Sequence, residues 1–169
     1  MQFEYSTMGV EPKRRVEYWS DVVARHFIPA NVWLGPTGES DLSWRGHTLG
    51  SLKVDECHAP VRTWDRTEQH VRIRPEDDLL VTHIVTGTGH MTHAGRELQL
   101  LPGDTAIYDA NAPFRQEMTG TAIAVRIPKA LLIPRVPLEL AALNSKLGAT
   151  GADGRPDSLD DSRSFRFYV

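Results

Sequence analysis

The stretch GRELQLLPGDTAIYDANAPF, residues 95–114, decides the fold class of this chain. It opens with a glycine, continues through an apolar segment, breaks at Pro102-Gly103-Asp104, and resumes as an apolar run that ends at Asp109. Proline presets a backbone dihedral, glycine supplies free ones and aspartate caps backbone N–H groups, so the break has the chemistry of a tight turn. The stretch therefore predicts a strand, a turn and a second strand.

Around this hairpin, apolar residues recur with a period of two over most of residues 42–128. Glycine and proline interrupt the pattern often, as at the turn expected at Gly87-Thr88-Gly89. The clearest alternation, residues 121–128, places Ile123, Val125 and Ile127 on one face and Ala122, Ala124 and Arg126 on the other. Short strands separated so often by turns indicate a sandwich or barrel rather than a parallel sheet with crossover helices.

Helices are predicted at both ends of the β region. From a start near Pro12 to an end at Pro29, spacings of three and four relate the apolar residues Val16, Trp19, Val22, Val23 and Phe27. A loop is expected at 34–41, and short helices at 129–135 and 138–146. The chain is thus interpreted as one domain, 1–148, followed by an irregular segment, 149–169, whose aperiodic Gly, Asp, Ser and Arg are typical of disorder.

Composition limits the function classes. The 169 residues fit one domain, and a net charge of −3 with a pI near 6.1 gives no basic balance for nucleic-acid binding. No apolar run resembles a signal peptide or reaches the roughly 18 residues of a membrane span. The single cysteine, Cys57, cannot form an internal disulfide and is expected to be a small core residue. These features predict a cytoplasmic protein with no membrane partner.

The strand pattern resembles that of cupins, small β-barrels that often hold a catalytic metal. Their second signature places a histidine shortly after Gly-Asp, whereas Gly103-Asp104 is followed by Thr105, Ala106 and Ile107. Two ligands separated by one residue would share a face of a strand, but no two of the seven histidines have that spacing. We therefore predict no metal and no other cofactor.

Motifs for catalysis are equally weak. Gly87-Thr88-Gly89 is not followed by the Lys-Ser or Lys-Thr of a phosphate loop, and the serines lack a nucleophile-elbow pattern. The pair Asp77-Asp78 follows Pro75 in an expected loop and is interpreted as a turn rather than as an acid/base pair. The sequence therefore predicts no catalytic residue and no enzyme.

Residues 3–143 resemble the N-terminal sensor half of AraC/XylS-type transcription regulators, in the subgroup with a cupin-like AraC-binding domain. Four segments carry the resemblance: 3–27, similar to the family's lead helix; Arg66-Thr67; the hairpin, with Gly95-Arg96-Glu97, Pro102-Gly103-Asp104, Asp109 and Pro113 in register; and 127–137, where Lys129 replaces a more usual arginine. The resemblance implies a mainly β, cupin-like (double-stranded β-helix or jelly-roll) barrel with an N-terminal helix and short C-terminal helices.

The same resemblance implies that the barrel encloses a small organic effector. Residues on the expected strands that are candidates to bind it are Trp44, Trp64, Arg66, His83, Tyr108 and Arg126. Core packing of the aromatic residues, a solvated face for Arg126 and a surface or cross-strand ion pair for Arg66 are the alternatives. The hairpin residues Gly95, Pro102, Gly103, Asp104 and Asp109 are expected to shape turns rather than to touch a ligand.

After Leu147 the chain departs from the family pattern, since neither the dimerising helices nor the helix-turn-helix units follow. A piece of a longer regulator, a standalone sensor and a frameshifted, truncated product all fit this departure. The sequence therefore predicts a small-molecule effector as partner, no direct DNA binding by this chain, and at most a weak homodimer. The alternative function is a small standalone cupin enzyme or small-molecule-binding protein.

Overall fold

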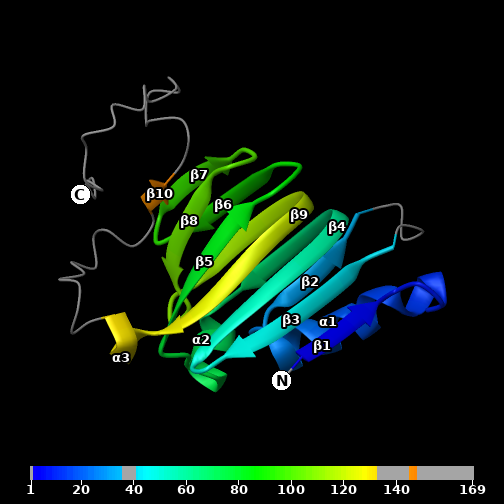
Figure 1. The fold of residues 1–169 in the computed structure, drawn as a ribbon, viewed down its shortest axis with the longest axis horizontal. Coiled ribbons are helices and arrows are strands. Elements are labelled where there is room, and N and C mark those ends of the chain that lie inside the picture. The colour runs from blue at the N-terminus through cyan, green and yellow to red at the C-terminus, as the bar shows by residue number, and fades with distance from the viewer. Residues whose placement is uncertain (1, 36–40, 133–144, 148–169) are drawn as a thin grey trace.

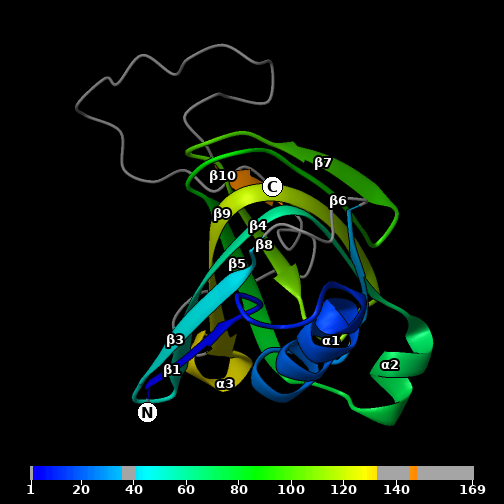
Figure 2. The same cartoon turned by 90° about the vertical axis from the view of Figure 1, so that its right-hand side faces the viewer.

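The computed structural model describes residues 2–35, 41–132 and 145–147 (Figure 1). Its strands form one antiparallel ten-stranded sheet, which curls so far that it encloses a core. In Figure 2 the strands arch over a helix that fills the open side. The predicted mainly β fold with an N-terminal helix is confirmed.

The sheet follows the order β1-β3-β4-β9-β5-β8-β10, with β2 beside β4, and with β6 between β9 and β7. The strands are β1 Gln2–Ser6, β2 Asn31–Leu34, β3 Ser43–Leu49, β4 Leu52–Arg66, β5 Asp78–Ile84, β6 Gly89–His93, β7 Arg96–Leu100, β8 Thr105–Asp109, β9 Phe114–Pro128 and β10 Ser145–Leu147. The predicted strand, turn and second strand are β7, a turn and β8, but the two strands do not form a hairpin. Instead β7 pairs with β6, whereas β8 pairs with β5 and β10.

The two longest strands, β4 and β9, turn the corner of the barrel together. Their register shifts between Ala59 and Arg62, and Gly120 on β9 has a φ of +70°. A side chain at Gly120 would meet the Thr86 carbonyl oxygen at 2.5 Å, so the corner requires glycine. The first half of β4 therefore pairs with β3, and its second half pairs with β2. On β9 the first half pairs with β6, and the second half pairs with β5.

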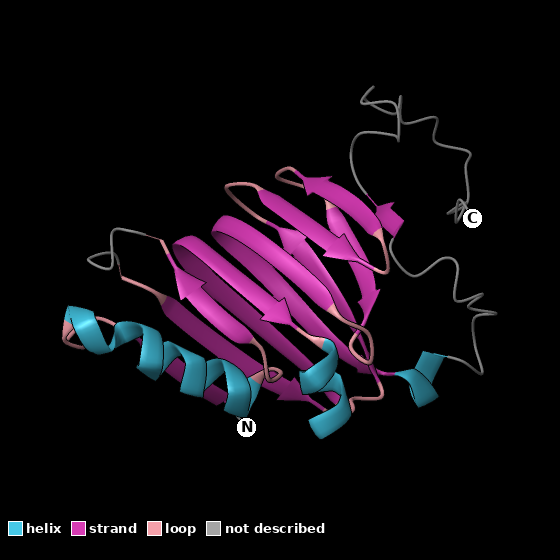
Figure 3. Cartoon of the chain, turned by 180° about the vertical axis from the view of Figure 1, so that it is seen from behind, coloured by secondary structure: helices cyan, strands magenta, loops and turns pink. Residues whose placement is uncertain are grey.

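The open side is filled by α1, Arg15–His26, which follows the 3-10 turn η1, Pro12–Arg14. Trp19, Val22 and Val23 of α1 are buried, and the Trp19 ring lies 5.8 Å from that of Trp44. Val16, predicted on the buried face, is 42% exposed because it lies in the first turn, before the helix crosses the barrel. The remaining helices are α2, Glu68–Ile73, and α3, Lys129–Leu132 (Figure 3).

Two expectations need correction at the chain ends, and a third is confirmed over its described residues. Residues 2–6, part of the segment similar to the family's lead helix, form β1 and pair with β3, as the alternation of Phe3 and Tyr5 allows. The helix predicted at 129–135 begins as α3. The helix predicted at 138–146 is wrong at its end, because residues 145–147 form β10 on the free edge of β8. Residues 133–144 and the segment 149–169 lie outside the described residues, and the boundary near 148 stays a prediction.

The alternation on β9 is confirmed, but its aliphatic face points outward. Ala122 and Arg126 are buried on the inner face, whereas Ile123, Val125 and Ile127 are half-buried on the outer one. Small side chains are needed inside because the large Trp44 and Trp19 rings already fill that part of the core. The positions of the large apolar residues alone therefore did not indicate which face of β9 points toward the core.

Candidate functional site

Four buried polar side chains gather inside the barrel, on four different strands. They are Arg62 of β4, Thr82 of β5, Tyr108 of β8 and Gln116 of β9, each at most 3% exposed, and we name them the inner polar cluster. Polar groups inside an apolar core are destabilising unless hydrogen bonds satisfy them. Their partners therefore indicate whether the cluster is complete without a ligand.

Arg62 is poorly satisfied. One terminal nitrogen, Nη1, donates to the Gly120 carbonyl at 3.1 Å, and the other, Nη2, faces the Met118 sulfur at 3.7 Å. The guanidinium carbon lies 5.8 Å from the centre of the Trp64 ring. Among the described residues no carboxylate pairs with Arg62. A buried guanidinium without a counter-ion lowers the stability of a fold, which points to a role other than packing.

The other members also present donors to the interior. The Gln116 amide nitrogen has the Met91 sulfur as its acceptor at 3.2 Å, and a thioether is a weak acceptor. The Tyr108 hydroxyl and the Thr82 hydroxyl are 3.0 Å apart. Burial raises the pKa of Tyr108 to about 12, against the opposing effects of Thr82, Gln116 and Arg62, so the phenol keeps its proton as a donor.

Asp55, near the start of β4, contributes a buried carboxylate to the interior. It is 1% exposed, and neither carboxylate oxygen reaches hydrogen-bond geometry. Burial raises its pKa to about 6, while the nearby Trp44 indole, Arg126 and Lys53 act in the opposite direction. Trp44 lies close enough to influence the titration, but its N–H does not complete a hydrogen bond. Gly46 faces Asp55 and leaves room for it, since a Cβ there would lie 2.2 Å from Oδ1.

Of the predicted binding residues, five are buried on the inner side of the sheet, and the three aromatic ones lie in the hydrophobic core. The Trp44 and Trp64 rings stack at 5.5 Å, and Phe27 packs against both. Tyr108 belongs to the inner polar cluster. His83 lies apart from them, since Thr82 and Ile84 on either side of it face inward, and its Nδ1 is 2.9 Å from the Thr105 hydroxyl.

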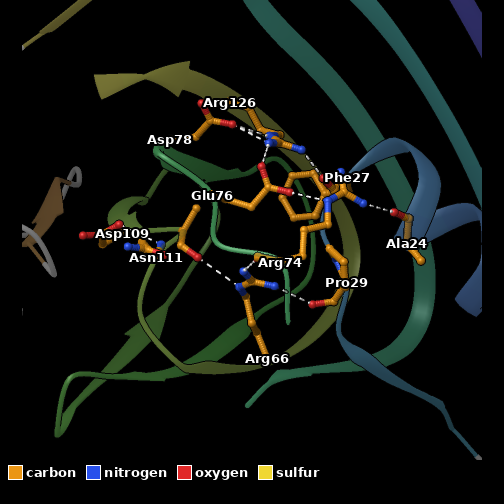
Figure 4. A network of polar contacts seen from close by, with 11 residues as sticks. Ala24, Phe27, Pro29, Arg66, Arg74, Glu76, Asp78, Asp109, Asn111 and Arg126 are labelled. Carbon is orange, nitrogen blue, oxygen red and sulfur yellow. Dashed lines mark hydrogen bonds and ion pairs between the residues drawn. The ribbon is translucent and has the colours of Figure 1, made fainter. Parts of the chain in front are cut away.

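Arg66 and Arg126 lie at the C-terminal end of α1, where they form an arginine cap together with Arg74 (Figure 4). Arg66 donates to the carbonyls of Ala110 at 2.9 Å, Pro29 at 2.9 Å and Arg74 at 2.7 Å. It is fully buried, so the surface or cross-strand ion pair considered for it is not what holds it. All of its nitrogens already have backbone acceptors, so an acidic effector would have to displace them.

Arg126 is occupied in the same way. It donates to the Phe27 carbonyl and to the Asp78 carboxylate, and it lies 2.9 Å from Glu76. Arg74 bridges Glu76 at 2.8 Å and the Ala24 carbonyl at 3.1 Å. The solvated face considered for Arg126 is wrong, because the side chain is 5% exposed. The cap satisfies carbonyls that the end of a helix leaves without partners.

The hairpin residues have the geometry of turns. The Asp104 carboxylate accepts the Leu101 N–H at 2.7 Å, beside Gly103 with a φ of +91°. Asp109 accepts the Asn111 N–H at 2.8 Å and also contacts Lys129 at 2.8 Å. Gly95 and Pro102 lie in the turns on either side of β7, and Gly95 has a φ of +75°. None of these contacts involves the inner polar cluster.

No three His, Cys, Asp or Glu side chains of the described residues gather as metal ligands would, and the absence of a metal stays a prediction. Cys57 is buried, and burial raises the pKa of its thiol.

A hollow of about 410 Å³ lies at the start of α1, between Gly9, Glu11, Arg14 and Glu17. It is an open surface feature that shares no residue with the inner polar cluster, so we assign it no binding role.

The structure describes no helix with the length and apolar character that crossing a membrane demands.

Sequence reasoning missed Asp55, Arg62, Thr82 and Gln116. One signal was available, because Arg62, Trp64 and Arg66 alternate with a period of two and thus share a face. The bulge before Arg62 hides the continuity of that face with Asp55. Thr82 and Gln116 gave no signal, because their burial depends on strands distant in the sequence.

Comparison with known proteins shows which family and which solved structures this chain is similar to. The family model of the AraC-binding-like domain matches residues 19–156. The crystal structure of the AraC-like transcriptional activator CuxR has a TM-score of 0.76 at 22% identity, covering 88% of this chain and 55% of that one. An uncharacterised protein in the nit 5′ region of Bacillus sp. (strain OxB-1) is 27% identical over 142 residues, covering 80% of this chain and 54% of the relative.

An RmlC-like cupin from Shewanella frigidimarina also matches, at a TM-score of 0.42 and 14% identity, over 52% of this chain and 76% of that one. The chain spans about half the length of CuxR and of the Bacillus relative. The predicted mainly β, cupin-like barrel is confirmed by the antiparallel sheet that closes around a core, by the match to CuxR and by the AraC-binding-like domain model.

Proposed function

The chain belongs to the AraC-binding-like domain family, as the sequence predicts, and on that premise we propose that it senses a small organic effector for an AraC-type transcription regulator. The effector binds inside the barrel, and its occupancy is passed to a DNA-binding part of the regulator. The barrel acts as a binding module in the cytoplasm and not as an enzyme.

One observation carries this proposal, namely the incomplete satisfaction of the inner polar cluster. Arg62 and Gln116 each use a methionine sulfur as an acceptor, although both are buried. Their donors would gain from an oxygen-bearing ligand, because hydrogen bonds to oxygen are stronger than those to a thioether. The stacked Trp44 and Trp64 rings offer an apolar surface to the rest of such a ligand.

The experiment is a thermal-shift screen of the purified chain against a broad metabolite library. A ligand that binds only the folded state stabilises it, by about 2.7 kcal/mol when its concentration is 100 times the Kd. We expect at least one compound to raise Tm, and we expect Tyr108→Phe and Trp64→Ala to reduce that shift. A folded sample that no compound stabilises would exclude the sensor function, and turnover of a hit would favour the cupin enzyme instead.

The DNA-binding part is proposed to lie elsewhere than in the described domain. The described helices are separated by strands, so no two consecutive ones form a helix-turn-helix. Any self-association of the described domain is proposed to be a weak homodimer. Sedimentation velocity over a range of protein concentrations tests this, since a tight dimer at low concentration would contradict it.

A further inference from the structure

Arg62 and Gln116 form a donor pair suited to a carboxylate. Resting on the proposed sensor function, we propose that this pair binds the carboxylate group of the effector, so that the ligand class is an organic acid with an apolar body. Arg66, four residues later on β4, is the arginine of that strand that the sequence predicts as an effector-binding candidate. The structure distinguishes the two arginines by their partners.

Strand register places the two donors side by side. Arg62 pairs with Met118 across β4 and β9, and Trp64 pairs with Gln116 in the next inward-facing row. Side chains on one face at such diagonal positions are within reach of each other. A single carboxylate has two oxygens, so one oxygen can accept from Arg62 Nη2 while the other accepts from the Gln116 amide.

The acceptors that these donors now use can move aside. Met118 and Met91 are unbranched, flexible side chains that adapt their packing easily. By contrast, the acceptors of Arg66 are three backbone carbonyls fixed by β8, the arginine cap and the end of α1. A ligand can replace a methionine sulfur more easily than it can replace a fixed carbonyl.

Charge selects an acid over a neutral ligand. A neutral ligand would leave the Arg62 charge buried and unpaired, whereas a carboxylate would supply a counter-ion and charge-assisted hydrogen bonds. The Tyr108 hydroxyl adds a third donor. Asp55 would repel the acid at its own end of the interior, which directs the acid toward Arg62.

The apolar body of the ligand is predicted to lie along the tryptophans. The guanidinium of Arg62 is 5.8 Å from the centre of the Trp64 ring, and the Trp44 ring stacks on Trp64 at 5.5 Å. An acid held by Arg62 therefore places its adjoining carbons beside an aromatic surface.

Matched acids and amides test the proposal by thermal shift and by isothermal titration calorimetry. The probes are benzoate with benzamide, hexanoate with hexanamide, and the acids found by the metabolite screen with their amides. The variants are Arg62→Met, Arg62→Lys and Gln116→Leu. Arg45→Met is the control, because Arg45 is an exposed arginine paired with Glu56, and the variant loses the same charge.

We expect at least one acid to stabilise the wild type and Arg45→Met, its amide to bind at least tenfold more weakly, and Arg62→Met to lose the shift. Arg62→Lys and Gln116→Leu should each retain part of the affinity. Without ligand, Arg62→Met should have a Tm equal to or above that of the wild type, because an unpaired buried charge has been removed.

Three results would overturn the proposal: equal binding of acid and amide, unchanged acid binding by Arg62→Met, or an unliganded Arg62→Met that melts well below Arg45→Met. Hits confined to neutral or cationic compounds would also overturn it, while the sensor function would stand. If no class of compound binds, the sensor function itself fails.

Discussion

At the scale of single residues, equal burial conceals different roles for three arginines. Arg62, Arg66 and Arg126 are all at most 5% exposed on the inner side of β4 and β9. Arg66 and Arg126 have each donor matched to an oxygen, whereas Arg62 has one backbone oxygen and one sulfur. The identity of the acceptors separates the arginines that hold the fold from Arg62, which we propose binds a ligand.

Arg66→Met is expected to destabilise the fold strongly. The change leaves the carbonyls of Ala110, Pro29 and Arg74 without a donor inside the protein. Since unsatisfied buried groups cost about 1–3 kcal/mol each, the free energy of unfolding should fall by roughly 3–5 kcal/mol. Urea denaturation measures this loss, and an Arg66→Met variant as stable as Arg62→Met would contradict it.

Asp55 is expected to make the wild type less stable as the pH rises from about 4 to 7. Burial raises its folded pKa from 3.8 to about 6, so between these values the folded state binds more protons than the unfolded state. Rising pH therefore favours unfolding in that window, by about 3 kcal/mol at most. Asp55→Asn carries no such charge and should escape this loss.

The measurement is the free energy of unfolding of both proteins from about pH 4 to pH 7.5. The stability of Asp55→Asn relative to the wild type should increase up to a pH of about 6.5 and then remain constant. Asp21→Asn, at an exposed carboxylate paired with Arg25, is the control for loss of one acid. A constant difference between Asp55→Asn and wild type across the range would show that Asp55 is not held protonated by burial.

At the scale of elements, turns that depend on neighbouring residues could be predicted from the sequence, whereas the pairing and orientation of the strands could not. The turn between β7 and β8 follows from residues adjacent in sequence, and Asp104 closes it on Leu101, but the two strands pair with other strands and not with each other. Which face of β9 points inward depends on the packing of Trp19 and Trp44, which lie far from β9 in the sequence. The strand β10 depends on an unpaired edge of β8 that no local pattern reveals.

The candidate site divides in the same way. Aromatic residues on a predicted strand indicate an interior, so Trp44, Trp64 and Tyr108 could be predicted from sequence. Arg62 could not be distinguished from Arg66, because the difference lies in what each donor meets across the barrel. Apart from the Arg74 carbonyl, which is 8 residues away, those acceptors are contributed by residues 37 to 58 positions distant along the chain.

Gly120→Ala is expected to be far more damaging than Gly103→Ala. Both glycines have a positive φ, which is unfavourable for alanine by about 1–2 kcal/mol. At Gly103 a Cβ has open space, whereas at Gly120 it would meet the backbone of Thr86 at 2.5 Å. Thermal denaturation should show a loss for Gly120→Ala clearly larger than for Gly103→Ala. Equal losses would mean that the corner of β9 can relax.

At the scale of the whole molecule, α1 connects the chain's N-terminal region to the interior that we propose binds the effector. Its Trp19 packs on Trp44, and the arginine cap binds its C-terminal end to β4, β9 and the segment before β5. Effector binding beside Trp64 would therefore affect α1, the helix that crosses the open side of the barrel. This contact offers a physical route from occupancy to the rest of a regulator.

The chain is expected not to bind operator DNA by itself. Its net charge is −3, and its most basic run, Lys13-Arg14-Arg15, is not a free patch. Lys13 pairs with Glu11 at 2.9 Å, and Arg15 is buried, with its Nε donating to the Val10 carbonyl. Phosphate contacts by lysine and arginine supply most non-specific affinity, so this surface should attract DNA weakly.

Selection from a random duplex library, followed by fluorescence anisotropy at about 50 mM salt, measures this. We expect no enriched sequence and a Kd weaker than about 10⁻⁴ M, the weak end of the non-specific range. Specific binding needs an element that enters a groove, and the described helices are either packed on the barrel or shorter than two turns. Sequence-specific binding below about 10⁻⁷ M would show that α1 leaves the barrel or that residues outside the described ones read DNA, and either outcome would contradict a domain that only senses.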